Sequence, residues 1–446
     1  METLSFNALA ERFLGTRLPG WLSDSISFTE LSPDAKGVVL RLLSLMQRSL
    51  CPATEFNTQM IWLLANVTPG MLPSAWGGRI PPVTSPGRHR KLDDYVMKQT
   101  RVSDGSQPVY IDIGCGFPPA TTVDTARRLP DWSVFGVDRW FARYVLYDAD
   151  GNYACFDRDG KLQYLQARTK PLNDNPPASK EQFNLLFADL YPKLTMVGEH
   201  CSETVEIDGN RLVRNHVRDF EGKNIKFIES EIDDLQLPAA GAIRCMNVLL
   251  YFEKDFREIM QASMSTLLDH DGVLITGFNH PFGIYARYVI NKKGRHEIFP
   301  SEFAFSPDNL RPLGVGPWLT LADEDREAEL LADVTGAIRA DRHFWPEFNP
   351  YVDELRTKYG ICRRDSDGFI HFTEEARTAS PSVIMEKTSA LWSQLEEEGY
   401  TDGAVDALER AGYQAWKNAV GDIAVLPPEG SLPKFEVMEQ KDGVEP

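Results

Sequence analysis

The chain has 446 residues, a formal net charge of −18 and 42% hydrophobic residues, a composition typical of a globular protein with one large domain or two domains. No apolar run reaches the roughly 18 residues that cross a bilayer. The negative charge disfavours a nucleic-acid partner, because phosphates would repel the chain. The six cysteines form no CxxC pair, which argues against a zinc site. We expect a cytoplasmic protein without a signal peptide.

Changes in composition divide the chain into three predicted regions. Residues 1–100 are expected to be helical, with a helix start at Ser32-Pro33 and a Pro/Gly-rich linker at 68–87. Residues 101–300 are predicted to form an α/β core, and residues 301–446 an acidic, mainly helical region that includes 384–420. A solvated helix face is expected for the local basic cluster, which consists of Arg88, Arg90, Lys91, Lys98 and Arg101.

Short apolar runs alternate with amphipathic stretches between residues 106 and 280. This alternation predicts a doubly wound, Rossmann-like sheet with helices on both faces. Strands are expected at 108–113, 133–137, 224–228, 242–246 and 272–277, and helices at 121–129 and 256–268. The segment 141–223 is too long for a simple crossover. Its turn dipeptides Asp150-Gly151 and Asp159-Gly160 predict a small antiparallel β insertion, followed by a helix near 181–193.

The strongest motif is Asp112-x-Gly114-x-Gly116, directly after the first predicted strand. Glycine lets the backbone approach a ligand closely, and the N-terminus of the following helix offers free N–H groups to an anion. Asp138 ends the next predicted strand, where an acid accepts hydrogen bonds from ribose hydroxyls. Together with Arg139 beside it, these residues predict a nucleotide-type cofactor site.

Two cofactors fit this pattern, NAD and S-adenosylmethionine (SAM). The NAD fingerprint requires a third glycine where this chain has Pro119, and it does not require an acid before the first glycine. The motif resembles the first motif of class I SAM-dependent methyltransferases, although Pro118 replaces that family's third glycine. The resemblance implies the class I methyltransferase fold and SAM as the cofactor; the helical regions at both ends are additions to that fold.

Two later segments extend the resemblance over about residues 108–280. Glu231 falls on the family's adenine-binding acid and Ile232 on the residue beside the adenine ring. Residues 245–252, CMNVLLYF, resemble a segment of the chemotaxis receptor methyltransferases, which methylate protein glutamates. Met246 departs from that segment, where the family has Arg. The resemblance implies a transferase and leaves the acceptor open.

Candidates for contact with the substrate follow the fourth and fifth predicted strands, since ligands of open α/β sheets bind beyond the carboxyl ends of strands. Asn247 is expected to hold the amino-acid part of SAM, Tyr251 to lie near the methyl group, and His280 to act as a base for a hydroxyl or amine acceptor. Asn279 and Tyr285 are further candidates. No metal is expected.

The acceptor is expected to be a small molecule or a protein side chain, and the oligomeric state is open. The alternatives are a degenerate SAM-binding sensor or scaffold domain and an NAD-dependent enzyme. The insertion and the C-terminal region are predicted to enclose the acceptor. The aromatic residues of these additions either line that pocket or form a separate core; they include Tyr285, Tyr288, Phe344, Trp345, Phe348 and Tyr351.

Overall fold

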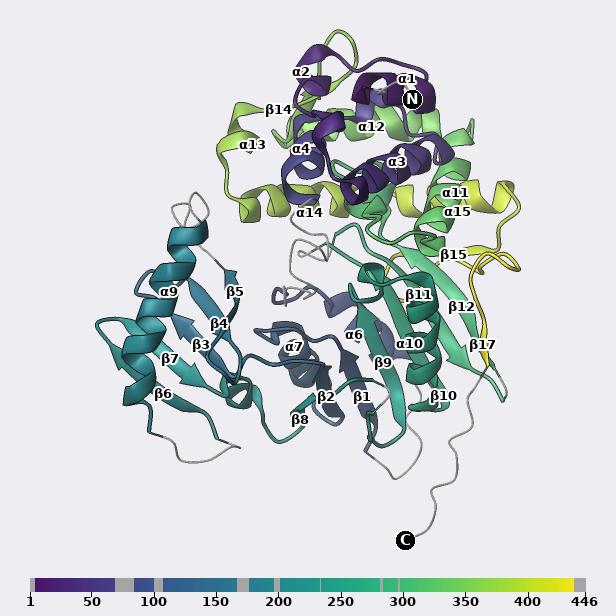
Figure 1. The fold of residues 1–446 in the computed structure, drawn as a ribbon. Coiled ribbons are helices and arrows are strands. Elements are labelled where there is room, and N and C mark those ends of the chain that lie inside the picture. Colours follow the sequence, from purple (N-terminus) through teal and green to yellow (C-terminus); the bar gives the residue numbers. More distant parts are fainter. Residues whose placement is uncertain are drawn as a thin grey trace. The chain divides into compact units, whose positions relative to one another are not determined.

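Contacts between residues divide the chain into two units (Figure 1). Unit 1 combines Met1–Ile80, Arg88–Val102 and Pro238–Pro446, and unit 2 combines Pro81–Gly87 with Ser103–Leu237. The computed structural model describes residues 5–68, 84–99, 107–166, 176–195, 201–232, 234–280, 284–295 and 297–436. The three domains expected from composition stay a prediction.

Unit 2 contains the strand–turn–helix–strand element that the sequence predicts. It consists of β1 (Val109–Ile113), α7 (Ala120–Arg128), β2 (Ser133–Asp138) and β8 (Ile225–Glu229). β2 lies between β1 and β8 and pairs with both in parallel. All five residues of β1 are buried, as expected for a parallel strand covered on both faces. These elements confirm the predicted Rossmann-like core.

The predicted β insertion is a separate five-stranded sheet of unit 2 in the order β5-β4-β3-β7-β6. Every pair in it is antiparallel. Its strands are β3 (Tyr144–Tyr147), β4 (Tyr153–Phe156), β5 (Leu162–Gln166), β6 (Glu203–Ile207) and β7 (Asn210–Arg214). Helix α9 (Pro176–Leu190) packs on this sheet and stacks Phe187 on Phe156 at 4.3 Å between ring centroids. The insertion thus has a core of its own.

The sheet of unit 1 begins with β9 (Ala240–Met246) and β10 (Leu268–Phe278), which pair in parallel. Helix α10 (Lys254–Thr266) connects these two strands. The strands beyond β10 are antiparallel and were not predicted. They are β11 (Arg287–Lys293), β12 (Glu297–Phe305), β15 (Ala415–Lys417), β16 (Ile423–Val425) and β17 (Phe435–Glu436). The expected helix at 384–420 is therefore wrong beyond residue 410, where α15 ends.

Helices cover both faces of this sheet, as predicted. Arg244 of β9 is ion-paired at 2.8 Å with Asp93 of α6 (Arg90–Gln99), and both side chains are buried. Thr276 of β10 donates to the Glu327 carboxylate of α11 (Arg326–Ala340) at 3.4 Å. Arg244 is paired in register with Ile275, the neighbour of Thr276. Because adjacent strand residues point to opposite faces, α6 and α11 lie on opposite sides of the sheet.

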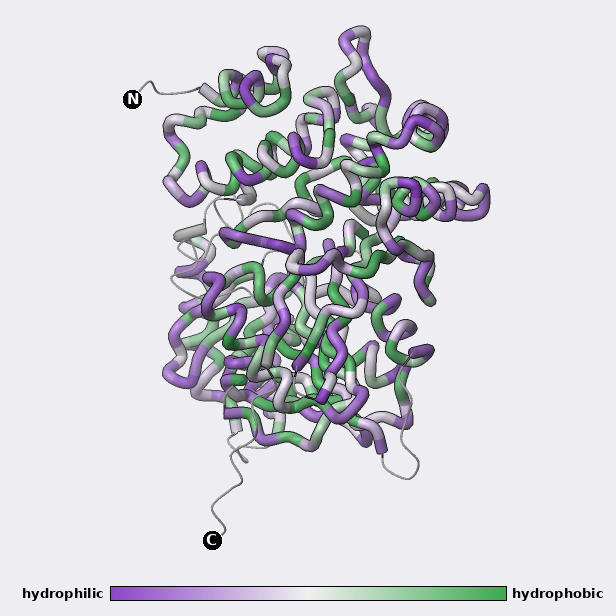
Figure 2. Tube along the Cα trace, turned by 90° about the vertical axis from the view of Figure 1, so that its right-hand side faces the viewer, coloured by the Kyte–Doolittle hydropathy of each residue, from purple (hydrophilic) through white to green (hydrophobic). Residues whose placement is uncertain are grey.

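The N-terminal helices of unit 1 are α1 (Phe6–Leu14), α2 (Gly20–Ser23), α3 (Pro33–Arg48) and α4 (Thr58–Trp62). The predicted start of α3 is confirmed, because the Ser32 hydroxyl accepts from the backbone N–H of Ala35 at 3.2 Å. Along many helices purple, hydrophilic residues alternate with green, hydrophobic residues (Figure 2). For α3 the apolar side packs in a core shared with α1 and with Ala328 and Ala332 of α11.

The remaining C-terminal elements of unit 1 are α12 (Trp345–Lys358), β13 (Cys362–Arg364), β14 (Ile370–Phe372), α13 (Glu374–Thr378), α14 (Pro381–Glu397) and α15 (Tyr400–Arg410). Phe344 and Phe348 lie within one hydrophobic core with the sheet, and Trp345 and Tyr351 pack against it. Tyr288 is fully buried. This arrangement favours the alternative in which these aromatic residues form a separate core, rather than the wall of an acceptor pocket.

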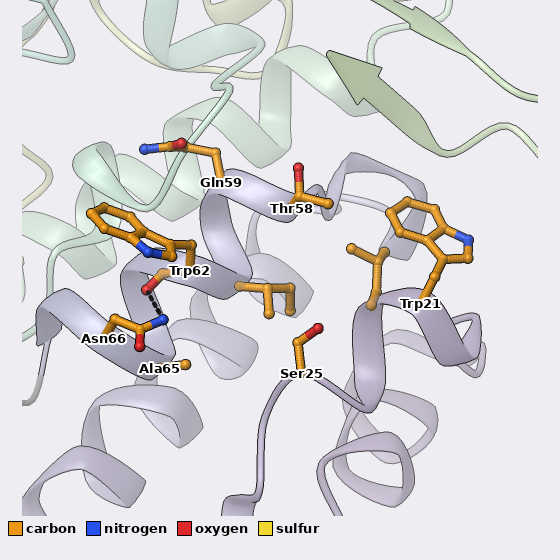
Figure 3. Close-up of a pocket in the computed structure, with 9 residues that line it drawn as sticks. Trp21, Ser25, Thr58, Gln59, Trp62, Ala65 and Asn66 are labelled. Atoms are coloured by element: carbon orange, nitrogen blue, oxygen red, sulfur yellow. Dashed lines mark hydrogen bonds between the residues drawn. The ribbon is translucent and has the colours of Figure 1, made fainter. Parts of the chain in front are cut away.

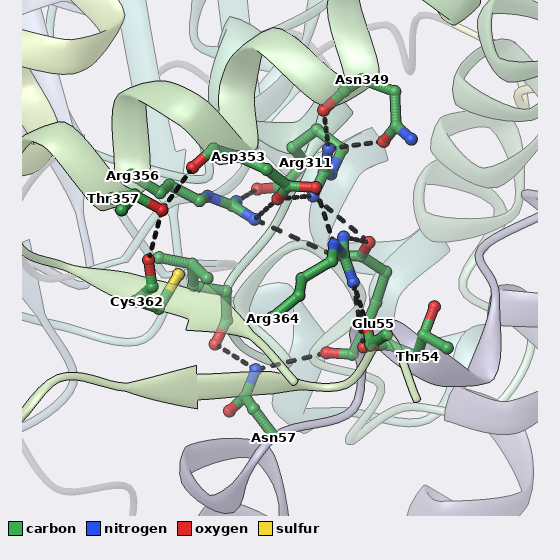
Figure 4. Close-up of polar contacts among 12 residues, drawn as sticks. Thr54, Glu55, Asn57, Arg311, Asn349, Asp353, Arg356, Thr357, Cys362 and Arg364 are labelled. Carbon is green, nitrogen blue, oxygen red and sulfur yellow. Dashed lines mark hydrogen bonds and ion pairs between the residues drawn. The ribbon is translucent and has the colours of Figure 1, made fainter. Parts of the chain in front are cut away.

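A buried ion-pair network joins the N-terminal and C-terminal parts of unit 1 (Figure 4). Glu55 contacts the guanidinium groups of Arg364 at 2.5 Å and Arg311 at 3.3 Å. Asp353 of α12 pairs with the same two arginines at 2.6 and 2.7 Å. Burial alone would raise the pKa of Glu55, but Arg311, Arg364 and Arg356 outweigh it and lower that pKa to about 2. The Glu55 carboxylate is therefore charged in the folded protein.

Candidate cofactor site

The glycine motif forms the turn between β1 and α7 in unit 2. Gly114 and Gly116 have φ values of 71° and 66°, a conformation that L side chains rarely adopt. The N–H groups of Gly114 and Cys115 donate to the Val137 carbonyl of β2 at 2.8 and 3.2 Å. Gly114 is exposed, whereas Ile113 and Cys115 on either side are buried. The turn thus offers open backbone to a ligand.

Asp138 lies beside this turn at the end of β2. One carboxylate oxygen accepts the Gly116 N–H at 3.0 Å, and the other accepts the Trp140 N–H at 3.3 Å. Burial raises the pKa of Asp138 to about 6, although both hydrogen bonds act to lower it. A carboxylate has about four lone-pair positions, so Asp138 retains the capacity to accept hydrogen bonds from ligand hydroxyls.

The other predicted cofactor residues of unit 2 differ in exposure. Asp112 is buried and accepts the Thr122 hydroxyl at 2.6 Å, a contact that holds the first turn of α7 against β1. Arg139 and Glu231 are exposed, and Ile232 is buried. The Ser230 N–H donates to the Asp138 carbonyl at 3.0 Å. This bond brings the segment after β8 to the end of β2, so the three strand ends meet.

The candidates Asn247, Tyr251 and His280 belong to unit 1. Asn247 follows β9 with a φ of 61°, and its carboxamide exchanges hydrogen bonds with Asn279. Burial lowers the pKa of His280 to about 4, helped by the positive charge of Arg88. Burial also raises the pKa of Tyr251. Both side chains are therefore neutral near pH 7, a protonation state in which an imidazole can accept a proton.

The expected solvated basic face is wrong for Arg88, which is buried, as is its neighbour His89. The Arg88 guanidinium donates to the side-chain oxygen of Asn279 at 2.9 Å and to its carbonyl at 2.6 Å. The Asn279 carboxamide donates to the Arg88 carbonyl at 2.9 Å. Lys91 is ion-paired with the buried Asp422 at 2.7 Å. These partners lie 191 and 331 residues away, so local composition gave no signal of them.

Tyr285, a further candidate, has a structural environment. Its backbone N–H donates to both carboxylate oxygens of Asp308 at 3.0 and 3.1 Å. Its hydroxyl accepts the Leu313 N–H at 3.1 Å. Burial raises the pKa of Tyr285 to about 12. The residue therefore packs as part of the fold of unit 1.

An aromatic cluster of unit 2 was not predicted. Phe117, the residue after Gly116, packs with His216 at 5.4 Å between ring centroids. The His216 ring bonds Asp219 at 2.7 Å through Nδ1 and the Tyr147 hydroxyl at 3.1 Å through Nε2. Burial lowers the pKa of His216. The cluster connects the insertion to the glycine turn through Phe117.

Neither a membrane-spanning helix nor a metal site was found in the part of the chain that the structure describes. No helix there is long and apolar enough to cross a membrane. The same residues contain no group of three or more His, Cys, Asp or Glu side chains that could hold a metal ion.

No protein-family model matches this chain, and no curated protein matches it. Similar solved structures are described as methyltransferases. A SAM-dependent methyltransferase from Clostridium acetobutylicum has 12% identity and a TM-score of 0.20, over 49% of this chain and 66% of that one. A second, from Methanococcus maripaludis, has 11% identity and a TM-score of 0.23, over 76% and 84%. The plantazolicin methyltransferase BpumL, in complex with SAH, has 9% identity and a TM-score of 0.25, over 81% and 94%.

The chain spans 66% and 53% of the lengths of the first two structures it matches. At TM-scores of 0.20 to 0.25, these likenesses decide neither activity nor substrate. The residues of the glycine turn are the feature of this chain that points to a cofactor.

Proposed function

We propose that this protein is a SAM-dependent methyltransferase whose cofactor binds at the glycine turn of unit 2. The observation that supports it most is the hydrogen bond from the Gly116 N–H to the Asp138 carboxylate, next to the exposed backbone of Gly114. Gly114 and Gly116 would let the cofactor approach the backbone, and Asp138 would accept the ribose hydroxyls. Glu231 would accept from the adenine amino group.

When bound, SAM supplies a methyl group on a positively charged sulfur, and the neutral thioether that remains is a good leaving group. The chain's own work is to align the acceptor, exclude water and, for a hydroxyl or amine, remove a proton. We propose His280 for this last role because it follows β10, where the sequence predicts the acceptor; its imidazole is unprotonated near pH 7, and the pKa of about 4 makes it a weak base. A carboxylate acceptor would need no base. Asn247 and Tyr251 are proposed as further contacts, and the likeness of residues 245–252 to chemotaxis receptor methyltransferases stays a prediction.

Calorimetry on the full chain with SAM, S-adenosylhomocysteine and NAD tests the cofactor. We expect saturable binding of the first two and none of NAD; binding of NAD alone would overturn the proposal. Incubation of cell extracts with methyl-labelled SAM, with and without the protein, then tests transfer. Binding without labelling of any extract component would favour the alternative, a degenerate SAM-binding sensor or scaffold.

A further inference from the structure

A cavity of about 360 Å³ lies among the N-terminal helices of unit 1 (Figure 3). Trp21 of α2 and Trp62 of α4 lie at opposite ends of the group of lining side chains. Leu22, Ile61 and Ala65 supply its apolar surface. The volume lies within the roughly 300–1,000 Å³ that is usual for small-molecule sites.

Both tryptophans are unusually open to solvent. Trp21 is 40% exposed and Trp62 is 53% exposed. Burial of an indole ring normally stabilises a folded protein, and these two rings beside one cavity contribute little of that stabilisation. Exposed aromatic surface of this kind is typical of a site that a ligand covers.

The surroundings hold the Trp21 ring and the backbone of Trp62 in place before any ligand arrives. The Trp21 ring lies 4.4 Å from the His371 ring and meets Phe369 edge-on at 6.3 Å, measured between centroids. The Trp62 carbonyl accepts the Asn66 carboxamide at 3.2 Å. α4 continues directly into a π-helix at Leu63–Val67, an irregularity that is frequent at functional sites.

The polar groups of the cavity indicate the charge of its ligand. Ser25 and Thr58 bring hydroxyls, and Gln59 brings a carboxamide. Among the nine described residues that line the cavity, none is charged. A charged ligand would lose its hydration here without an opposing charge in the wall. A neutral ligand with one or two polar substituents would find donors and acceptors for them.

We propose that this cavity binds a neutral, planar aromatic compound in contact with Trp21 and Trp62. A planar ring matches the flat indole faces better than a saturated ring of similar size, because stacked and edge-to-face contacts add to the burial of apolar area. The hydroxyl and amide groups of the wall would select a ligand with a hydroxyl or ring nitrogen. This site goes beyond the proposed methyltransferase activity and does not depend on it, since it needs no SAM.

Fluorine NMR of the full chain labelled with fluorotryptophan tests the site, with the resonances of the two residues assigned by Trp21→Phe and Trp62→Phe. The probes are naphthol, its saturated analogue decalol and the anion naphthoate. We expect naphthol to shift the Trp21 and Trp62 resonances saturably and to leave those of Trp132, Trp318 and Trp392 unchanged. Absence of a saturable shift, or equal binding of decalol or naphthoate, would overturn the proposal.

Affinity measurements provide a second readout. Trp62→Ala is expected to weaken naphthol binding about tenfold, through loss of one aromatic contact. Since Trp62 is mostly exposed, this variant should fold normally, which circular dichroism checks. Leu40→Ala is the matched control, because Leu40 is an exposed apolar residue of α3 outside the lining. Equal losses in both variants would contradict the site.

Discussion

Asn247 and Asn279 exchange hydrogen bonds across the ends of two parallel strands. The Asn247 carboxamide donates to the Asn279 side-chain oxygen at 2.8 Å, and the Asn279 N–H donates back to the Asn247 oxygen at 3.1 Å. The same Asn279 oxygen accepts from the buried Arg88. Arg88 thereby fixes which way both carboxamides point, although it lies far away in sequence.

Asn279→Ala should therefore destabilise the protein by about 2–3 kcal/mol, since it leaves the buried Arg88 guanidinium with fewer acceptors. Urea unfolding measures the free energy. Asn210→Ala, at the start of β7 where the carboxamide donates to the Asp208 carbonyl at the long distance of 3.5 Å, should change stability by less than about 0.5 kcal/mol. Similar values for the two variants would show that the Arg88 contact contributes little.

Gly114→Ala should weaken SAM binding about tenfold or more, because a methyl group would stand on the exposed backbone that the cofactor approaches. It should also cost about 1 kcal/mol of stability, since φ is positive. Gly151→Ala is the matched control: Gly151 has a φ of +79°, and an added Cβ there meets nothing within 4 Å. Calorimetry should find normal SAM affinity for the control and a loss for Gly114→Ala; no difference would argue against this turn as the cofactor site.

SAM affinity should fall as the pH is lowered from about 7 to about 5. The pKa of Asp138 is raised from 3.8 to about 6, so its carboxylate becomes protonated in this range and loses charge-assisted hydrogen bonds. Asp138→Asn should bind SAM about tenfold more weakly at neutral pH and show a flatter pH profile. Asp131→Asn, in an exposed loop of the same unit, should retain the wild-type profile. A wild-type profile in Asp138→Asn would exclude this carboxylate as the titrating group.

Glu55→Gln should destabilise the protein by about 3 kcal/mol at neutral pH, because it removes the buried carboxylate shared by Arg311 and Arg364. The pKa of Glu55 is lowered from 4.5 to about 2. Its stabilisation is therefore complete above about pH 4.5 and is lost as the pH falls towards 2. The difference between the variant and the wild type, measured by urea unfolding, should shrink over that range. A constant difference would show that charge is not the cause.

The core strands were predictable because each is a short apolar run bounded by turn residues. β1, β2, β8 and β9 begin and end within two residues of the predicted limits. β11 and β12 were missed because they contain polar residues such as Asn291 and Glu302, which the sequence pattern favours at the surface. In the fold both are buried, and Glu302 accepts hydrogen bonds from Tyr95 and Asn418.

The site was predictable only where its residues are local. Gly114, Gly116 and Asp138 follow from the strand–turn–helix pattern, since neighbouring parallel strands end at the same edge. Arg88 and His216 could not be found in this way, because their partners come from segments distant in sequence. A basic cluster on a predicted helix is usually solvated, and only the contacts of Arg88 with Asn279, made just before α6 begins, reverse that expectation.

The discontinuity of unit 1 has a consequence for how the protein is made. Its last piece, Pro238–Pro446, follows the whole of unit 2 in the chain. During synthesis, which proceeds at about 5–20 residues per second, β1, β2, β8 and the insertion leave the ribosome before the last piece of unit 1, so they can fold while the C-terminal partners of α3 and α6 are still missing. The apolar side of α3 can pack against α1 early, but the part that Ala328 and Ala332 of α11 cover stays exposed until α11 emerges. The N-terminal helices therefore complete their core only after the whole of unit 2 and the start of the last piece have been synthesised.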